Sequence, residues 1–586
     1  MINAPLIFGA DVEIRLSSGQ MPGENDFKIY KHISKNGMRV SIKNISDTAK
    51  QVKEIALFAG NIPVNQAKVY GEGYHMLCQY RGDMSRLEVV GAYGDDKSFF
   101  HLVDNPYDAG HCLVYYLLQL SYEGEHSLIA FASCHKFLGK FRFSPGYLEA
   151  VMDCEDIVLQ PGAVWDMEEL VVFSGSDANA LYYQLGAAIN ANHPPMKSSW
   201  NKIPTGWCSY YCVGTFSPAE IYKNAEAMAA RIPELEMIQI DAGLNKRNGD
   251  WNEWKFDDDL AAACEKVRGY GVDVGGYYSP FVVDNDSTLA KNHPDWLVKD
   301  EEGRPTNRRC RKESWFILDG SHPEARAHLK KLIRYMYDEC GLRYFKLDFL
   351  SYGALPAGVR YDSTITSIEA YRIGMKAILE EVGEDSFVLA CNAPFWPTLG
   401  LCHANRTTND IFRGWKQVGV NALEQFYRNW QHQRLWINDP DVVVLEKLEI
   451  VRTKDGKPSP RPCTLTDAEF EFHKAFAVAC GGMILSGDLL YEISDANIEV
   501  LKKMKNAMGE AAVFDNDNFE VGRFMTKDII CLFNWNDLQR VITADIEGTV
   551  AVKDFFTEEE IGKFEANIAI ELPPHGGKVL TFTKLT

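Results

Sequence analysis

The segment YFKLDFL, residues 344–350, places a lysine and an aspartate two positions apart in an apolar run. Side chains two apart on a β-strand point to the same side, so Lys346 and Asp348 should lie together. A nearby ammonium favours the charged form of a carboxylate, and a carboxylate that stays ionised can act as a nucleophile. An isolated Lys-x-Asp is more often a structural ion pair, and only its place at a strand end favours a functional role.

A second polar segment, ANRTTNDIFRGW (404–415), carries Arg406 and Asp410 after another expected strand. Retaining cleavage of a glycosidic bond uses two carboxylates about 5–5.5 Å apart, one as nucleophile and one as acid and base. Asp348 and Asp410 could supply such a pair. Taken alone, NRTTND is equally typical of a helix N-cap, where Asn and Asp are common.

Eight short apolar runs that alternate with amphipathic helices would position these groups. In order they are TGWCSYY, EMIQID, DVGGYYSPF, YFKLDF, FVLACNAP, ANRTTND, RLWINDPD and GGMILSGD. Eight such units predict a (β/α)8 barrel, whose chemistry lies at the C-terminal ends of its strands. The reactive residues that end these runs are Asp241, Tyr277, Asp348, Cys391, Asp410, Asp439, Asp441 and Asp488.

The barrel has a β-rich region on each side. Residues 1–190 contain short alternating runs such as VEIRLS, MRVSIKNI and CLVYYLLQLSY, which predict an N-terminal β-sandwich. Residues 511–586 return to strands and turns and predict a small antiparallel C-terminal β-domain. The fold class is therefore α/β, with a (β/α)8 TIM barrel over 191–510, and 586 residues suit about three domains.

Composition limits the partners and the compartment. Sixty-one Lys and Arg against 81 Asp and Glu give a net charge of −20, which disfavours nucleic acid and anionic membrane surfaces. The 14 cysteines show no Cys-x-x-Cys pair and no zinc spacing, as expected of reduced thiols. The N-terminal MINAPLIFGADVEIRL lacks the basic and apolar regions of a signal peptide, so a cytoplasmic location is expected.

Competing chemistries lack their motifs. No Gly-x-Gly-x-x-Gly, P-loop or Gly-x-Ser-x-Gly sequence is present. HQRLWINDPD brings His432, Asp439 and Asp441 close in sequence, which could suggest a metal site. The spacing and the absence of a second histidine favour a structural or sugar-contacting role instead.

The motifs together resemble a known family. In chain order they are GWCSYYCVG (206–214), IQIDAG with GDW (238–251), YFKLDFL, the Cys391 segment, RTTND, WINDPDVV and ILSGDLL. This series resembles glycoside hydrolase family 36 and, more distantly, family 27, the clan of the α-galactosidases. The resemblance covers most of residues 200–490, and the flanking β-regions are similar to the family's three-part layout.

The resemblance implies a role for each matched residue. Asp348 would be the nucleophile and Asp410 the acid/base, while Lys346 and Arg406 would hold sugar hydroxyls. Sugar-binding roles fall to Asp241, Trp207, Tyr210, Trp251, Tyr277, Cys391, Asn392 and Asp488. The implied substrate is an α-linked oligosaccharide or glycoconjugate, and no metal or organic cofactor is required.

Two departures from the family pattern bear on the substrate. The family usually has paired aspartates after the second strand, and here the second is Ala242. The segment from Asn392 to Phe395 matches neither the family 27 nor the family 36 pattern. A retaining α-galactosidase is therefore the first interpretation, and an α-N-acetylgalactosaminidase or another α-glycosidase is an alternative. A transglycosylase similar to raffinose synthases and a non-catalytic sugar-binding protein are the others. The sequence leaves open whether the chain forms a homo-oligomer.

Overall fold

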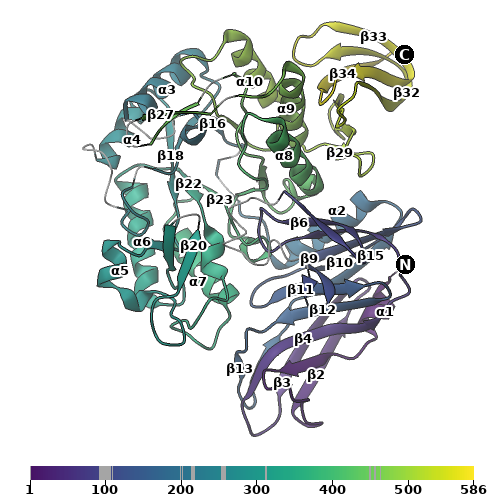
Figure 1. Ribbon diagram of the computed structural model, residues 1–586, viewed down its shortest axis with the longest axis vertical. Helices are drawn as coiled ribbons and strands as arrows, with labels where there is room; N and C mark the ends of the chain where they lie inside the picture. The colour runs from purple at the N-terminus through teal and green to yellow at the C-terminus, as the bar shows by residue number, and fades with distance from the viewer. Residues whose placement is uncertain are drawn as a thin grey trace.

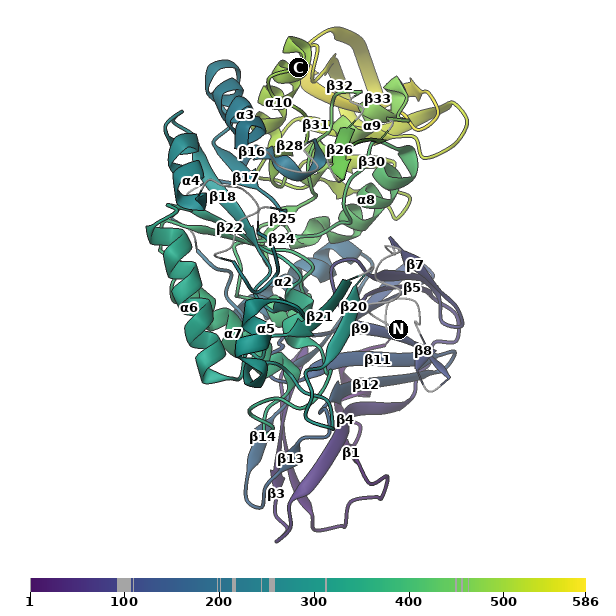
Figure 2. The same ribbon diagram turned by 60° about the vertical axis from the view of Figure 1, so that its left-hand side comes forward.

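The computed structural model describes residues 2–91, 107–108, 110–197, 199–200, 202–212, 218–243, 245–251, 259–310, 313–447, 450–454, 457–461 and 463–585. Figure 1 shows the N-terminal strands, the barrel in teal and green, and the C-terminal strands in yellow as three regions of the chain. The turned view in Figure 2 keeps the N-terminal strands beside the barrel and below the yellow strands.

The N-terminal region is built almost entirely of strands, hydrogen-bonded into one sheet of 15. Two helices accompany them, α1 (Ala4–Phe8) and α2 (Ala178–Asn192). The strands are β1 (Glu13–Leu16), β2 (Phe27–Ile33), β3 (Gly37–Asn44), β4 (Lys50–Asn61), β5 (Lys68–Glu72), β6 (Gln79–Asp83), β7 (Leu87–Val90), β8 (Tyr107–Asp108), β9 (His111–Tyr122), β10 (Glu125–Phe131), β11 (Leu138–Ser144), β12 (Tyr147–Asp153), β13 (Val158–Leu159), β14 (Val164–Asp166) and β15 (Leu170–Gly175). The predicted strand content is thus confirmed, and the sandwich arrangement stays a prediction.

A nearly closed parallel barrel of eight strands forms the middle of the chain, in the order β25-β24-β23-β22-β18-β17-β16-β28. Its strands are β16 (Thr205–Cys208), β17 (Met237–Ile240), β18 (Asp273–Tyr278), β22 (Tyr344–Leu347), β23 (Phe387–Ala390), β24 (Ala404–Arg406), β25 (Ile437–Asp439) and β28 (Ile484–Ser486). Each lies in one of the eight predicted runs, so the barrel prediction is confirmed. Between β25 and β28, the Met483 N–H donates to the Asn438 carbonyl at 3.0 Å.

Helices surround this barrel, and short strands interrupt its connections. The helices are α3 (Pro218–Arg231), α4 (Leu260–Arg268), α5 (Thr288–Asn292), α6 (Pro323–Asp338), α7 (Ser367–Leu379), α8 (Trp415–Arg428), α9 (Asp467–Cys480) and α10 (Asp495–Ala507). The additional strands are β19 (Val282–Asp284), β20 (Asn307–Cys310), β21 (Glu313–Ile317), β26 (Ile450–Lys454) and β27 (Lys457–Arg461).

Local sequence explains these barrel elements. All four residues of β16, β17, β22 and β23 are buried, because helices cover the outer face of a parallel barrel and side chains fill its interior. Gly206 allows β16 and β17 to approach, since a Cβ there would collide with the Met237 carbonyl. Capping boxes start α7 at Thr366 and α9 at Thr466, each with a glutamate three residues later.

The C-terminal strands form a six-stranded sheet that packs on α9. They are β29 (Val513–Phe514), β30 (Val521–Arg523), β31 (Ile529–Phe533), β32 (Arg540–Asp554), β33 (Glu560–Leu572) and β34 (Gly577–Leu585). His575 stacks on Trp415 with centroids 4.0 Å apart and lies 3.1 Å from Glu469. These contacts fix the sheet to the helical side of the barrel.

Two further observations concern the chain as described. No helix in the described ranges is long and apolar enough to cross a membrane. No disulfide joins the cysteines whose side chains the structure describes, and Cys463 is the least buried of them.

Candidate active site

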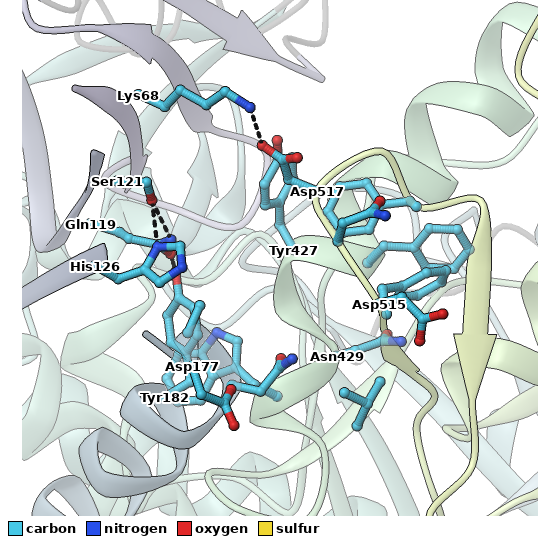
Figure 3. Close-up of a pocket in the computed structure, with 18 of the residues that line it drawn as sticks. Lys68, Gln119, Ser121, His126, Asp177, Tyr182, Tyr427, Asn429, Asp515 and Asp517 are labelled. Carbon is cyan, nitrogen blue, oxygen red and sulfur yellow. Dashed lines mark hydrogen bonds and ion pairs between the residues drawn. The ribbon is translucent and has the colours of Figure 1, made fainter. Parts of the chain in front are cut away.

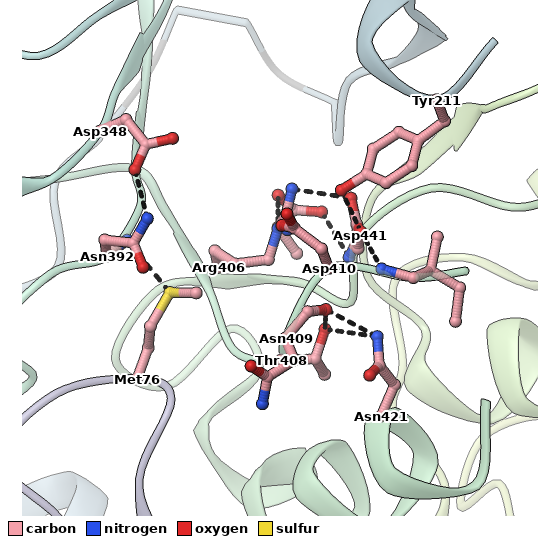
Figure 4. A network of polar contacts seen from close by, with 12 residues as sticks. Met76, Tyr211, Asp348, Asn392, Arg406, Thr408, Asn409, Asp410, Asn421 and Asp441 are labelled. Carbon is pink, nitrogen blue, oxygen red and sulfur yellow. Dashed lines mark hydrogen bonds and ion pairs between the residues drawn. The ribbon is translucent and has the colours of Figure 1, made fainter. Parts of the chain in front are cut away.

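Polar residues from several strands gather at the carboxyl end of the barrel. Asp241 follows β17, Asp348 follows β22, Arg406 ends β24, Asp439 ends β25 and Asp488 lies just beyond β28. The carboxyl ends of parallel barrel strands open on the same face, so these side chains share one mouth. Figure 4 shows the part of this mouth that contains Asp348, Arg406 and Asp410.

Lys346 lies between two carboxylates. Its Nζ donates to Asp241 Oδ2 at 2.8 Å and is 3.6 Å from Asp348 Oδ2. All three residues are at least nine-tenths buried. Burial alone would lower the pKa of Lys346, but the two neighbouring carboxylates hold that pKa well above its ordinary value. Lys346 is therefore an ammonium, and its charge favours the ionised form of Asp241.

Asp241 is bound on both carboxylate oxygens. Gln239 Nε2 donates to Oδ2 at 2.5 Å, and the Ala242 N–H donates to Oδ1 at 2.8 Å. Burial opposes the charge of Asp241, but Lys346 and these donors hold its pKa below the ordinary value. The adjacent Ala242 has only a methyl group where the family resemblance expects a second carboxylate.

The two oxygens of Asp348 have different surroundings. Oδ1 accepts the Phe349 N–H at 2.7 Å and Asn392 Nδ2 at 2.6 Å. Phe349 and Asn392 both have left-handed backbone conformations, with φ of 49° and 42°, which for Phe349 costs about 1–3 kcal/mol. Lys346 Nζ lies 3.6 Å from Oδ2, and no hydrogen bond to Oδ2 is found within the described residues. Oδ2 is thus the oxygen that remains available to attack a substrate.

Arg406 is held by three carboxylates. Its Nε lies 3.0 Å from Asp439, one terminal nitrogen 2.7 Å from Asp441 and the other 3.3 Å from Asp410. Asp439 and Asp441 are buried, whereas the side chain of Asp410 is 29% exposed. The buried pair fixes the guanidinium plane, and that plane directs one nitrogen towards Asp410 at the open side (Figure 4).

Asp441, one of the carboxylates around Arg406, has a raised pKa. Tyr211 and the Ile411 N–H, the latter at 2.6 Å, both donate to its Oδ2. Burial raises the pKa of Asp441 to about 7, although Arg406 acts in the opposite direction and Asp410 adds to the rise. Asp441 can therefore exchange a proton near neutral pH.

Tyr277 lies against the Lys346 pair and Trp251 lies behind it. The Lys346 ammonium is 5.7 Å from the Tyr277 ring centroid, and Trp251 is 6.1 Å from Tyr277 and 4.5 Å from Tyr278. Trp251 is only 3% exposed, so its ring is mostly covered by protein. A small cavity of about 20 Å³ is lined by Asp241, Trp251 and Tyr277 among others.

Trp207 and Asp488 are joined to each other. The fully buried Trp207 donates through Nε1 to the Asp488 carbonyl at 2.7 Å. The Asp488 carboxylate pairs with Arg413 and accepts the Leu445 N–H at 2.7 Å. Burial raises the pKa of Asp488, and Arg413 opposes that rise. Trp207 and Asp488 thus connect β16 to β28, and their predicted contacts with sugar stay predictions.

Cys391 and Tyr210 complete the predicted set. Cys391 is 2% exposed and donates its backbone N–H to the Leu347 carbonyl at 2.8 Å. Burial raises the pKa of its thiol, which therefore stays protonated. Tyr210 is half-buried and meets Tyr211 edge to face, with centroids 5.2 Å apart. The predicted residues thus surround one barrel mouth, although several are covered by protein.

Sequence reasoning named some contributors to the site and missed others. Asp439 and Asp441 were expected to have a structural or sugar-contacting role, and the structure shows that both hold Arg406. Arg413, within the RTTNDIFRGW segment, was missed by the sequence analysis and pairs with Asp488 beyond β28. Met76 comes from the N-terminal sheet and contacts Asn392, and nothing local in the sequence marks it. No group of His, Cys, Asp or Glu in the described part of the chain is arranged to hold a metal ion.

A much larger cavity lies elsewhere, between the N-terminal sheet, α2, α8 and the start of the C-terminal sheet. Its volume is about 1590 Å³, and none of the twelve predicted site residues lines it. Figure 3 shows its polar edge, where Lys68 pairs with Asp517 at 3.0 Å, and its aromatic wall with Tyr182 and Tyr427. Because polar groups at barrel strand ends carry the chemistry in this fold, position and not volume identifies the site.

The fold and the site define the chain as a (β/α)8-barrel protein with two cation-held carboxylates at the ends of its fourth and sixth strands. Residues 241–385 match the Melibiase family. This range contains Asp241, Lys346 and Asp348, and Asp410 lies beyond it. The predicted resemblance to the α-galactosidase clan is confirmed by this match.

Three comparisons illustrate that likeness. An α-galactosidase of Escherichia coli is 30% identical over 142 residues, which are 22% of this chain and 19% of that protein. TtGalA, an α-galactosidase from Thermus thermophilus solved with p-nitrophenyl α-D-galactopyranoside, is 19% identical with a TM-score of 0.62, covering 84% of this chain and 98% of that one. A variant of the family 36 α-galactosidase AgaA from Geobacillus stearothermophilus, solved with raffinose, is 12% identical with a TM-score of 0.62, covering 98% and 89%.

The curated relatives match only part of their own length, whereas the solved structures match nearly all of it. The chain spans 16% to 32% of the length of the curated relatives it matches. The structural neighbours share the fold at low sequence identity. The glycosidase assignment thus has support from relatives as well as from the site.

Proposed function

We propose that this protein is a retaining glycoside hydrolase that cleaves terminal α-galactosyl residues from oligosaccharides through a covalent glycosyl-enzyme. The observation that carries the proposal is the pair of carboxylates at the ends of β22 and β24. Asp348 is buried beside Lys346, and Asp410 is partly exposed beside Arg406. A double displacement at an anomeric carbon needs two carboxyl groups, one to attack and one that can reach both the leaving oxygen and water.

Asp348 acts as the nucleophile. Two hydrogen bonds hold Oδ1, so the carboxylate is fixed while Oδ2 remains free to attack the anomeric carbon. As the bond from Oδ2 to that carbon forms, the bond to the leaving oxygen breaks and Asp410 gives that oxygen a proton. The Lys346 ammonium lies 3.6 Å from Asp348 Oδ2 and stabilises this carboxylate as the leaving group in the second step.

Asp410 then reverses its role. It takes a proton from a water molecule, the water oxygen attacks the anomeric carbon, and the bond to Asp348 breaks. Asp410 ends the cycle protonated, one water is consumed, and the sugar is released with its original anomeric configuration. The exposure of Asp410 supports this role, because the same group must reach both the leaving oxygen and water.

The glycone site is built around Asp241 and Lys346. Charged groups that are already paired can bind sugar hydroxyls without leaving a buried charge alone. Ala242 removes one acceptor, and a lost hydrogen bond to a charged group is worth about 1.5–3 kcal/mol. This observation favours a second candidate, a retaining α-glycosidase for another glycone such as N-acetylgalactosamine. Transglycosylation, in which a sugar replaces water as the acceptor, is a further alternative.

We also propose the domain boundaries, the location and the partners of the protein. The domain boundaries are 1–190, 191–510 and 511–586, with an N-terminal β-sandwich and a small C-terminal β-domain. The location is cytoplasmic, which suits the hydrolysis of imported oligosaccharides. The partners are α-linked sugars, with assembly into a homo-oligomer left open, and neither nucleic acid nor membrane is expected.

A panel of aryl α-glycosides tests the proposal. We expect p-nitrophenyl α-galactoside to be hydrolysed faster than the N-acetylgalactosaminide and the arabinoside. Asp348→Asn should lower turnover by roughly 10³-fold or more, because the amide cannot attack. Asp517→Asn, at an exposed ion pair, is the matched control and should leave turnover unchanged. Faster hydrolysis of the N-acetylgalactosaminide would favour the second candidate. Unchanged turnover by the Asp348→Asn variant would contradict the mechanism.

A further inference from the structure

The segment between β5 and β6, residues 73–78, leaves the N-terminal sheet and reaches the barrel mouth. We call it the 73–78 loop. Its Met76 N–H donates to the Ala393 carbonyl at 3.3 Å, and the Phe395 N–H donates to the Tyr74 carbonyl at 3.2 Å. The loop is therefore paired with the stretch that follows β23, which begins with Cys391 and Asn392.

The side chain of Met76 binds the residue that holds Asp348. Met76 Sδ accepts the Asn392 N–H at 3.1 Å, and the side-chain amide of the same Asn392 donates to Asp348 Oδ1 at 2.6 Å. Figure 4 shows the three side chains in this order. Met76 is 1% exposed, and Asn392 has a φ of 42°. Without the sulfur, the N–H of the half-buried Asn392 would lose its acceptor, and the left-handed conformer would lose one of its supports.

A buried ion pair anchors the 73–78 loop on its other side. Arg428, at the end of α8, pairs with Glu72, and both side chains are fully buried. Arg428 also donates to the carbonyls of Met76 and Cys78 from the loop and to the Thr407 carbonyl, at 2.7 Å, after β24. The loop is thus fixed between the strand ends that carry the two proposed catalytic aspartates.

We propose that Met76 is a positioning residue of the active site, which acts through Asn392 to hold Asp348 in its attacking orientation. This inference rests on the proposed function. It makes the N-terminal sheet a part of the catalytic apparatus through the 73–78 loop. A nucleophile must be held closely to its productive geometry, so a loosened support should lower kcat more than it raises KM.

Met76→Leu is the direct test, because leucine keeps most of the volume and removes the sulfur acceptor. We expect kcat on an aryl α-galactoside to fall roughly 10-fold, because the hydrogen bond that fixes the Asn392 backbone is lost, with KM nearly unchanged. In an Asn392→Ala background, Met76→Leu should have no further effect, because its route to Asp348 is gone. Equal losses in both backgrounds would mean that Met76 only contributes to packing and would overturn the inference.

Met152→Leu is the matched control. Met152 Sδ accepts the Glu168 N–H at 3.3 Å inside the N-terminal sheet, away from the barrel mouth. This variant loses the same kind of acceptor and should leave kcat and KM unchanged. A similar fall in kcat for Met152→Leu would show that any weakening of the sheet lowers activity, and the specific role of Met76 would be rejected.

A crystal structure of Met76→Leu separates this inference from the proposed function. If the wild type cleaves no α-glycoside, the proposed function fails, but the variant structure still decides the positioning role. We expect the Asn392 amide to leave Asp348 Oδ1 or to occupy two conformers. An Asn392 amide that stays on Asp348 as in the wild type would overturn the inference.

Discussion

The side-chain amide of Asn392 donates a 2.6 Å hydrogen bond to Oδ1 of Asp348, the aspartate that follows β22. Asn392 follows the next strand of the barrel, and its backbone N–H is bound by Met76 from the N-terminal sheet. The orientation of one carboxylate thus depends on three separate parts of the chain. This dependence connects the fold to the chemistry proposed for the site.

Removal of the acid/base should affect poor leaving groups most. Asp410→Ala should slow the cleavage of raffinose by roughly 10²–10⁴-fold, and slow p-nitrophenyl α-galactoside less, because nitrophenolate leaves without protonation. Azide needs no general base and should restore turnover of the aryl substrate as α-galactosyl azide. Equal losses on both substrates, without rescue, would remove Asp410 from this role.

Lys346 should control the acid limb of the pH–rate profile. Lys346 keeps the pKa of Asp241 below its ordinary value, so Lys346→Met should raise that pKa. Asp241 then takes up its proton at higher pH, and the acid limb of kcat/KM should move to higher pH. Lys223→Met, in an exposed pair with Glu220, is the control. An acid limb that does not move would contradict the assigned electrostatics.

Asp441 should make stability fall with rising pH. Its pKa is raised from 3.8 to about 7 in the folded protein, so the folded form holds a proton that the unfolded form releases. The stabilisation is full below about pH 4 and is lost by about pH 7, and it amounts to at most about 4 kcal/mol. Asp441→Asn cannot titrate. Denaturant titrations from pH 4 to 7 should show the wild type losing stability relative to the variant, and parallel curves would refute the assignment.

Removal of one charge from the buried ion pair of Glu72 and Arg428 should destabilise the folded protein. Glu72→Gln leaves the Arg428 charge uncompensated in the interior and should lower the free energy of unfolding by about 3–5 kcal/mol. The double change Glu72→Met with Arg428→Met should cost less than the sum of the single changes, as urea unfolding would measure. Additive losses would show that the two charges act independently.

The barrel and its strand-end chemistry could be predicted because both depend on local pattern. Each of the eight apolar runs contains a barrel strand, and Asp348 and Asp410 lie at the mouth as the spacing indicated. Short apolar runs indicate buried strands, and the barrel topology brings the ends of these strands together. Lys346 could be paired with Asp348 for the same reason.

Long-range partners could not be predicted in this way. Met76 and Asn392 are 316 residues apart, and a methionine in a mixed polar and apolar loop carries no signal of a contact with a distant amide. The pairing of Lys346 on β22 with Asp241 after β17 could not be predicted from local spacing either, because β18 lies between these two strands. Trp207 and Trp251, predicted to shape the sugar pocket, are covered because large aromatic rings also fill the interior of a barrel.

The central claim is that Asp348 forms a covalent bond with the sugar. An activated 2-deoxy-2-fluoro galactosyl substrate forms that bond and releases it slowly, so the labelled enzyme can be digested and its peptides weighed. The account predicts a mass increase of one fluoro-sugar on the peptide that contains Asp348, and none in Asp348→Asn. A label on Asp410, or release of the inverted anomer with no label on any peptide, would contradict it.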